Sequence, residues 1–280
     1  MTATGPDEAT LTQLTEFALL LAGTAKSAIL PFFRGAPVTH NKAGAGRFDP
    51  VTEADRAAEA ALRTAIEARY PDHGILGEEY GEHAGGSDFR WVLDPIDGTR
   101  TFLIGGLHWG SLIALEFEGR PIIGVLAQPA TGEVFLGAPG LGRAELHRSG
   151  AISPLRCKPT PRLNEATYST THTDFFTNRA ELEAHNALSD AVKLALYGGD
   201  CYMYALIALG GHDLVLEAGL KPYDTAALVP IIEAAGGRMT DWQGRPSPMG
   251  GQVLASSGGD LHDQALALIA GAGAPSTGLA

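Results

Sequence analysis

The spacing of apolar residues near the N-terminus is helical. They recur three or four positions apart: Leu11, Leu14, Phe17, Ala18 and Leu21. This period predicts an amphipathic helix over about residues 8–33 that ends near Pro31. A second helix is expected after Thr52, an N-cap residue with Asp55 three positions on, and it should reach about Tyr70.

Strand patterns replace this helical period further along the chain. The apolar run "GIL" precedes Glu78 and Glu79, and the run "WVL" leads directly into Asp94. From about Trp109 to Leu146, apolar stretches alternate with glycine-containing turns, which indicates an antiparallel meander.

A Pro-rich and basic segment, Ser149–Arg162, separates this part from a second half. Beyond it, helical and strand patterns alternate, and the helix within "TAALVPIIEAAGG" should end at its paired glycines. The sequence therefore predicts a mixed α+β and α/β protein. Residues 1–148 would form an N-terminal half with the meander, and residues 149–280 a C-terminal half with the alternating elements.

Composition restricts the class of protein. Hydrophobic residues make up 45% of the 280 residues and charged residues 19%, so the chain can fold around a sizeable core. The net charge of −12 argues against a nucleic-acid or anionic-membrane surface, which needs clustered Lys and Arg. Cys157 and Cys201 form no disulfide framework, and two reduced thiols are typical of a cytoplasmic protein. The apolar stretch Phe17–Ala25 lacks a basic start and is too short to span a bilayer, so no membrane partner is expected.

The segment "WVLDPIDGTRTF" places two carboxylates at the end of an apolar strand. In a continuing strand Asp94 and Asp97 would point to opposite faces, because side chains alternate with a period of two. We expect them to converge because the chain turns at Pro95 and Gly98, which would also direct the Ile96 carbonyl outward. An all-oxygen cluster of this kind suits Mg²⁺, Mn²⁺ or Ca²⁺ rather than zinc.

Other carboxylates occupy comparable places. Glu78 follows an apolar strand, and Asp55 and Asp224 stand at helix starts. Two like charges about 4 Å apart repel by roughly 4 kcal/mol at an effective dielectric constant of 20, so several in one cleft would need divalent cations. Taken singly, the two aspartates could be helix-dipole partners, and Glu78 with Glu79 a solvated loop.

Together these motifs resemble those of a known family. "DPIDGTRTF", with "DPVTEADRAAE" and "GEE" before it and "KPYDTAA" after it, resembles the inositol monophosphatase family of Mg²⁺-dependent, lithium-sensitive phosphatases. The resemblance extends from the first helix to about Leu268, with one departure at Tyr223, where the family usually has Trp. It implies a layered α-β-α-β-α sandwich of the inositol monophosphatase and fructose-1,6-bisphosphatase type.

The resemblance also implies metal-assisted attack of water on phosphorus. Glu78, Asp94 and the Ile96 carbonyl would hold one Mg²⁺, and Asp94, Asp97 and Asp224 would hold a second. A third, weaker ion would lean on Glu78, and Mn²⁺ is an alternative metal. Two such ions can stabilise the entering and the leaving oxygen of a phosphoryl transfer.

By the same resemblance, groups near the metal ligands orient the attacking water and bind the phosphate. Thr99, hydrogen-bonded to Asp55, and Glu78 would orient the attacking water and relay its proton. The backbone N–H groups of Gly98 and Thr99 would bind phosphate oxygens at the start of a helix. No covalent intermediate is expected. Arg100 would contact phosphate or pair with a surface acid.

Selectivity must come from residues outside the metal ligands. The segment "YGGDCYMYALIALGGHDLVLEAGLKPYDTAA" most resembles the histidinol-phosphatase branch of the family, in which an aspartate and a glutamate lie near the substrate. These residues are Asp200 and Glu217 here. A carboxylate suits the ammonium and imidazole groups of histidinol, although it can also accept hydrogen bonds from the hydroxyl groups of inositol. Asp200 could instead simply cap the following helix.

The sequence thus predicts a cytoplasmic, Mg²⁺-dependent phosphomonoesterase that acts on L-histidinol phosphate in histidine biosynthesis. The alternatives are an inositol-1-phosphatase or broad sugar-phosphate phosphatase, and a metal-binding regulator that has lost turnover. Asp55, Glu78 and Thr99 argue against the regulator, because a pure binder needs no water-activating threonine. The resemblance also implies a homodimer, and it places Lys42 in a loop that closes over the active site.

Overall fold

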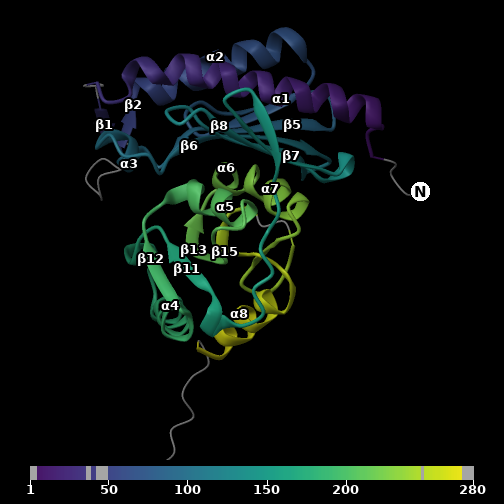
Figure 1. Cartoon of the computed structure of the whole chain (residues 1–280). Coiled ribbons are helices and arrows are strands. Elements are labelled where there is room, and N and C mark those ends of the chain that lie inside the picture. Colours follow the sequence, from purple (N-terminus) through teal and green to yellow (C-terminus); the bar gives the residue numbers. More distant parts are fainter. Residues whose placement is uncertain (1–4, 36–38, 42–49, 247–248, 273–280) are drawn as a thin grey trace, which may run out of the picture.

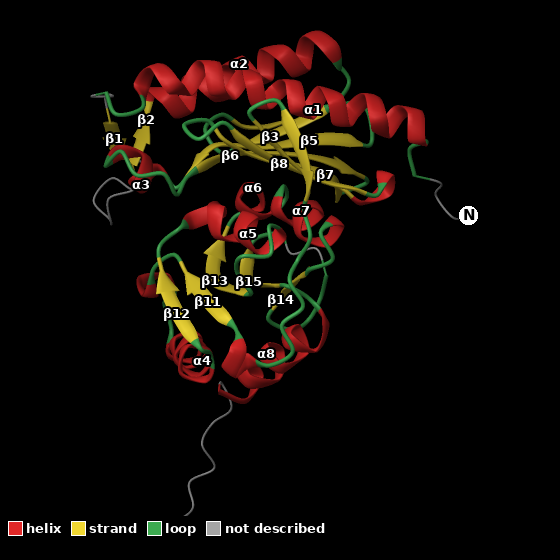
Figure 2. Cartoon of the chain, viewed as in Figure 1, coloured by secondary structure: helices red, strands yellow, loops and turns green. Residues whose placement is uncertain are grey.

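Two sheets and three helical layers alternate in the molecule (Figure 1). The computed structural model describes residues 5–35, 39–41, 50–246 and 249–272. Helices α1 and α2 cover one face of the larger sheet, α5, α6 and α7 lie between the sheets, and α4 and α8 cover the outer side of the smaller sheet (Figure 2). The α-β-α-β-α sandwich expected from the sequence is confirmed.

The larger sheet has eight strands in the order β10-β9-β8-β7-β6-β5-β3-β4. Neighbouring strands run antiparallel except β3 and β5, which run parallel. The strands are β3 (Gly74–Gly77), β4 (Gly81–His83), β5 (Phe89–Asp97), β6 (Gly110–Phe117), β7 (Arg120–Gln128), β8 (Glu133–Ala138), β9 (Arg143–Arg148) and β10 (Ala151–Pro154). Strands β6 to β9 are the predicted meander. A separate short ribbon pairs β1 (Thr39–Asn41) with β2 (Pro50–Thr52).

Helix α1 (Glu8–Ile29) packs its apolar stripe on this sheet, as its spacing predicts. Leu14, Leu21 and Ile29 are buried, and the helix contacts α2, β6 and β7. With the short turn after it, the segment Glu8–Phe32 is long and apolar enough to cross a membrane by length and composition. Here its stripe packs against strands and a second helix, as in the core helix of a globular domain.

Helix α2 (Glu53–Arg69) begins at the predicted capping box. The Thr52 side chain accepts a hydrogen bond from the backbone N–H of Ala54, and the Asp55 side chain accepts one from the backbone N–H of Thr52. The face turned to the sheet is apolar except for two buried carboxylates, Asp55 and Glu59. Helix α2 also contacts β5, so these two carboxylates lie on the face of the larger sheet that α1 and α2 cover.

The smaller sheet has five strands in the order β12-β11-β13-β15-β14. Strand β11 runs parallel to β12 and β13, and β15 runs antiparallel to β13 and β14. The strands are β11 (Thr167–Thr170), β12 (Leu194–Tyr197), β13 (Leu214–Leu220), β14 (Arg238–Asp241) and β15 (Gly251–Ser256). The helices on its outer side are α4 (Arg179–Ala191) and α8 (Gly259–Ala272).

The middle layer joins the two sheets through one core. It consists of α5 (Asp200–Ala208), α6 (Pro222–Thr225) and α7 (Leu228–Ala234), and its apolar side chains pack with residues from both sheets. Gly124 on β7 allows α7 to approach closely, because a Cβ there would overlap the carbonyl group of Ala227. Helix α6 contacts β5, which brings elements from the two halves of the chain together at the end of that strand.

Candidate metal centre

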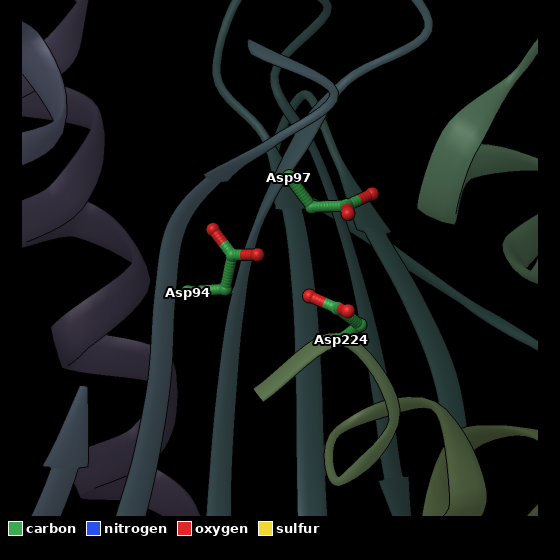
Figure 3. A group of neighbouring side chains, drawn as sticks. All are labelled: Asp94, Asp97 and Asp224. Carbon is green, nitrogen blue, oxygen red and sulfur yellow. The ribbon is translucent and has the colours of Figure 1, made fainter. Parts of the chain in front are cut away.

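Three aspartates converge where α6 meets β5. One carboxylate oxygen from each of Asp94, Asp97 and Asp224 lies within 4.8 Å of the other two (Figure 3). The first two residues belong to β5 and the third to α6. The structure therefore brings together three of the carboxylates that the sequence singles out, although they lie up to 130 positions apart in the chain.

Strand β5 achieves this convergence by an irregularity in its pairing, so the turn expected at Pro95 is wrong. The strand continues through Pro95 to Asp97, and its register against β6 shifts between Asp94 and Asp97. Such a shift breaks the strict alternation of side chains. The chain turns only at Gly98, where φ is +85° and a Cβ would lie 2.9 Å from the carbonyl oxygen of His108.

Hydrogen bonds fix the backbone of this irregular stretch. Ser111 Oγ donates to the Pro95 carbonyl oxygen (2.6 Å), and the Ile96 N–H donates to Asp94 Oδ1 (3.0 Å). The Ile96 carbonyl oxygen accepts the hydroxyl hydrogen of Thr99 (3.0 Å). Since a carbonyl oxygen has two lone pairs, the Ile96 oxygen keeps acceptor capacity for a cation.

Asp94 is buried, Asp97 and Asp224 are half-buried, and the cluster is short of positive charge. Within the described ranges, no Lys or Arg forms an ion pair with its three aspartates. Burial raises the pKa of Asp94 and Asp97 well above the usual value, and nearby carboxylates raise it further, chiefly Glu78 at Asp94 and Asp200 at Asp97. Burial likewise raises the pKa of Asp224 to about 7.

This donor set fits a hard divalent cation. The cluster offers carboxylate oxygens, with the Ile96 carbonyl nearby, and a cation among them would favour the ionised forms that burial disfavours. Backbone groups orient the carboxylates: the Cys201 N–H donates to Asp97 Oδ2 (2.7 Å), and the Lys221 N–H donates to Asp224 Oδ2 (2.6 Å). Carboxylate oxygens remain available for a cation at both residues.

Glu78 faces the same cluster from the end of β3. Its backbone N–H donates to the carbonyl oxygen of Leu93 (3.2 Å), which extends the pairing of β3 with β5 and sets Glu78 beside Asp94. After burial, the charge of Glu78 is the largest cause of the raised Asp94 pKa. It also raises the pKa of Asp55 and of Asp224, so Glu78 adds a fourth acidic group to the centre.

The hydrogen bond expected between Thr99 and Asp55 is not formed. Asp55 Oδ2 instead accepts the N–H (2.8 Å) and the hydroxyl hydrogen (2.5 Å) of Thr52, because Asp55 completes the capping box of its own helix. Thr99 donates to Ile96, as described above. Asp55 Oδ1 is buried and has no hydrogen-bond partner among the described residues, and burial raises the pKa of Asp55 to about 6.

A cavity of about 220 Å³ opens beside the aspartate cluster. Asp97 and Asp224 form one part of its lining, and the two candidate substrate residues, Asp200 and Glu217, form another. Asp200 adopts a left-handed backbone conformation, with φ of +43°, and its Oδ2 accepts the hydroxyl hydrogen of Thr101 (3.0 Å). Burial raises the pKa of Asp200 to about 6.

Glu217 is held in the cavity wall by two residues that sequence reasoning missed. Thr171 donates its N–H (3.0 Å) and its hydroxyl hydrogen to Oε1, and the Tyr204 hydroxyl donates to Oε2 (2.9 Å). Burial raises the pKa of Glu217. The only signals in the sequence are a threonine directly after a strand and the second of two tyrosines in the largely apolar segment "CYMYALIA".

Arg100 lies at the margin of this cavity. Its guanidinium carbon is 5.8 Å from the ring centre of Phe175, which lines the cavity, and its charge opposes the rise in the Asp200 pKa. The contact with Phe175 was also missed in the sequence. Lys42 lies outside the described residues.

Comparison with known proteins gives a consistent result. The model of the inositol monophosphatase family matches residues 10–273. The bifunctional phosphatase IMPL2, chloroplastic, of Arabidopsis thaliana is 41% identical over 275 residues, which cover 93% of this chain and 77% of that protein. A histidinol-phosphatase of Chlorobaculum parvum is 36% identical over 223 residues, or 79% and 83% of the two chains. The solved structure of an inositol monophosphatase from Zymomonas mobilis has a TM-score of 0.80 and 39% identity, and the match covers 92% of this chain and 98% of that one.

Proposed function

This chain belongs to the inositol monophosphatase family of metal-dependent phosphatases, and from that premise we propose that it is a Mg²⁺-dependent histidinol-phosphatase. The reaction is the hydrolysis of L-histidinol phosphate to L-histidinol and phosphate. One observation carries the proposal: Asp94, which is buried, and the half-buried Asp97 and Asp224 form a cluster with raised pKa values and no ion pair within the described residues. Such a cluster is typical of a functional site.

The chain supplies oxygen ligands for two or three Mg²⁺ ions, with Mn²⁺ as a substitute. These ligands are Glu78, Asp94, the Ile96 carbonyl, Asp97 and Asp224. When bound, Mg²⁺ supplies positive charge that acidifies water and stabilises the negative charge of the phosphoryl group.

Side chains around the cluster handle the water and its proton. The Thr99 hydroxyl donates to Ile96 and keeps lone pairs that accept a hydrogen of the attacking water. Glu78 accepts the proton that this water loses. Asp55, with a raised pKa of about 6 and one open oxygen, is a second acceptor for that proton. The backbone N–H groups of Gly98 and Thr99 hold phosphate oxygens during attack.

The cavity beside the cluster favours a substrate that carries positive charge. Among the described residues that line it, four are acidic and none is Lys or Arg: Asp97, Asp200, Glu217 and Asp224. Two of these acids belong to the metal ligands, so Asp200 and Glu217 remain for the organic part of the substrate. The ammonium and imidazole groups of histidinol match them in charge, and Arg100 at the margin is placed to contact phosphate.

A second candidate is an inositol-1-phosphatase or a broad sugar-phosphate phosphatase. Glu217 supports it, since a carboxylate already held by Thr171 and Tyr204 could also accept hydrogen bonds from the hydroxyl groups of a polyol. A metal-binding regulator without turnover is less well supported, because Glu78 and Thr99 are both present.

The proposed enzyme is a cytoplasmic homodimer. Its halves, residues 1–148 and 149–280, would meet at the metal centre, although β10 extends the larger sheet to Pro154. Molecular mass in solution tests the dimer.

The decisive experiment compares kcat/KM for L-histidinol phosphate and inositol-1-phosphate in Mg²⁺ and in EDTA. We expect L-histidinol phosphate to be preferred at least about tenfold, with activity lost in EDTA and restored by Mg²⁺. A tenfold preference for inositol-1-phosphate would contradict the substrate and leave the class of enzyme intact. Full activity in EDTA would contradict the class as well.

A further inference from the structure

Glu59 is a buried carboxylate to which the proposed reaction assigns no role. It lies on α2 four residues after Asp55, on the same face of the helix, and its side chain is 0% exposed. A carboxylate buried to this extent needs several hydrogen-bond donors. The donors to Glu59 include the backbone that directly follows Glu78.

Glu59 and Arg63 hold this backbone against α2. The Glu79 N–H donates to Glu59 Oε2 (2.7 Å), and the Tyr80 N–H donates to Glu59 Oε1 (3.2 Å). Arg63, one turn further along the helix, donates from Nε to Glu59 Oε1 (2.8 Å) and from a second nitrogen to the Gly81 carbonyl. The chain from Glu79 to Gly81 is therefore attached to α2 by side chains.

Gly77 shows how closely the strand approaches this carboxylate from the other side of Glu78. A Cβ built on Gly77 would overlap the Glu59 carboxylate. The φ of Gly77 is not positive, so the glycine is required for space and not for backbone conformation. Since the Glu78 N–H also bonds to Leu93, the backbone is fixed on both sides of Glu78.

We propose that Glu59 is a positioning residue that directs the Glu78 carboxylate into the metal centre. The inference rests on the proposed function, because it takes Glu78 to be a metal ligand. Without the Glu59 carboxylate, the amides of Glu79 and Tyr80 lose their acceptors, and the turn that carries Glu78 beside Asp94 can rearrange. Loss of a group that orients a ligand commonly lowers metal affinity 10- to 100-fold.

The test measures Mg²⁺ binding by titration calorimetry in the full-length protein. Glu59→Gln keeps the shape of the side chain but turns an NH₂ group towards one of its donors. We expect Mg²⁺ affinity to fall about tenfold or more, and the amide hydrogens of Glu79 and Tyr80 to exchange faster. Gly77→Ala, which displaces the same carboxylate from the strand side, should have the same two effects.

Glu116 provides a matched control. It is also 0% exposed and is bound to an arginine, with Arg90 Nε 2.8 Å from its Oε2. Arg90 precedes Asp94 on β5 by four residues, which is about 13 Å of strand. Glu116→Gln should therefore lower the Tm but leave Mg²⁺ affinity within about twofold of wild type. Equal losses of affinity in the Glu59 and Glu116 variants would overturn the inference.

Arg63→Gln keeps the test decisive if Glu59→Gln does not fold. It removes only the hydrogen bonds that Arg63 donates to Glu59 and to the Gly81 carbonyl, and it should lower Mg²⁺ affinity by about threefold to tenfold. Unchanged Mg²⁺ affinity in a folded Glu59 or Arg63 variant would overturn the positioning role of Glu59 and leave the proposed function intact. A wild-type protein that binds no Mg²⁺ would instead overturn the proposed function. Loss of Mg²⁺ affinity in Glu59→Gln would support the inference even if another phosphate ester proved to be the substrate.

Discussion

The larger and the smaller sheet each bury an aspartate to the same degree, but in opposite electrostatic settings. Asp94 on β5 and Asp213 just before β13 are both 2% exposed. Burial alone would raise the pKa of Asp213, but hydrogen bonds outweigh burial and the pKa is lowered. Thr160 donates its hydroxyl hydrogen (2.6 Å), and Thr167 donates its N–H (2.8 Å) and its hydroxyl hydrogen (2.9 Å). Around Asp94, the strongest neighbouring influences are other carboxylates, and the pKa is raised.

This contrast separates a structural carboxylate from a candidate metal ligand better than burial does. The hydrogen-bonding needs of Asp213 are met within the chain, so its charge stabilises the fold. Asp94 is buried beside Asp97 and Asp224, which are half-buried, and it gains little from them; stability alone would not retain this arrangement. The missing positive charge is what a bound metal ion would supply.

The same substitution at both positions should have opposite effects, and the larger one is on activity. Asp94→Asn removes a proposed metal ligand, so we expect kcat to fall at least about 10³-fold. It also removes one of several like charges, so the free energy of unfolding in EDTA at pH 8 should stay constant or rise by about 1–2 kcal/mol. Steady-state kinetics and urea unfolding measure the two effects. Substantial turnover, or a large loss of stability, would break the contrast.

Asp213→Asn should act on stability instead. An amide in this place turns an NH₂ group towards the donors of Thr160 or Thr167, so we expect the free energy of unfolding to fall by about 2–4 kcal/mol. At a temperature where the variant is folded, kcat should stay within about twofold of wild type. If kcat falls together with stability, Asp213 is not the purely structural residue that its hydrogen bonds indicate.

The sequence predicts most of the fold because local patterns determine most of its elements. The helical period that begins at Leu11, the capping box of Thr52 and Asp55, and the meander after Trp109 all appear in the structure. The acidic centre could also be predicted, because a carboxylate that follows an apolar run is unusual whatever surrounds it. Glu78 and Asp94 both satisfy that criterion.

Features that depend on tertiary pairing could not be predicted. The irregularity in β5 is a shift in its pairing with another strand, β6. The residues "DPID" alone therefore predict a turn at Pro95. The donors that hold Glu217 come from Thr171, 46 positions away, and from Tyr204, 13 positions away. The expected hydrogen bond between Thr99 and Asp55 is not formed because each side chain has a partner nearer in the sequence. Asp55 accepts from Thr52 in the capping box, and Thr99 donates to the Ile96 carbonyl at the end of the strand.

The metal-free protein should lose stability as pH rises. The pKa values of Asp55 and Asp200 are about 6 and that of Asp224 is about 7, whereas an unfolded aspartate has a pKa of about 3.9. Between about pH 4 and 7 the folded state therefore binds protons that the unfolded state has released, and its advantage disappears as pH rises through the folded pKa values. One pKa unit corresponds to about 1.4 kcal/mol, so the three shifts together should lower the free energy of unfolding in EDTA by about 5 kcal/mol from pH 5 to pH 8.

Urea unfolding at the two pH values measures this change, and added Mg²⁺ should stabilise the protein more at pH 8 than at pH 5. In Asp94→Asn the fall should be smaller, because one of the mutually repelling groups is gone. A stability that rises over this interval would show that the cluster is neutralised by some other part of the chain.

Two buried tyrosines give the smallest and most selective comparison. Tyr204 donates to Glu217 in the cavity wall (2.9 Å), whereas the Tyr168 hydroxyl shares a hydrogen bond with His185 Nδ1 (2.7 Å) within the smaller sheet and its helices. Each Tyr→Phe substitution removes one buried hydrogen bond, so each should lower the free energy of unfolding by about 1 kcal/mol. Only Tyr204→Phe loosens Glu217, so only this variant should raise KM for L-histidinol phosphate, by about threefold to tenfold, with little change in kcat. An equal rise in KM for Tyr168→Phe would mean that general loosening of the sheet causes the effect, and an unchanged KM in Tyr204→Phe would remove Glu217 from the substrate contacts.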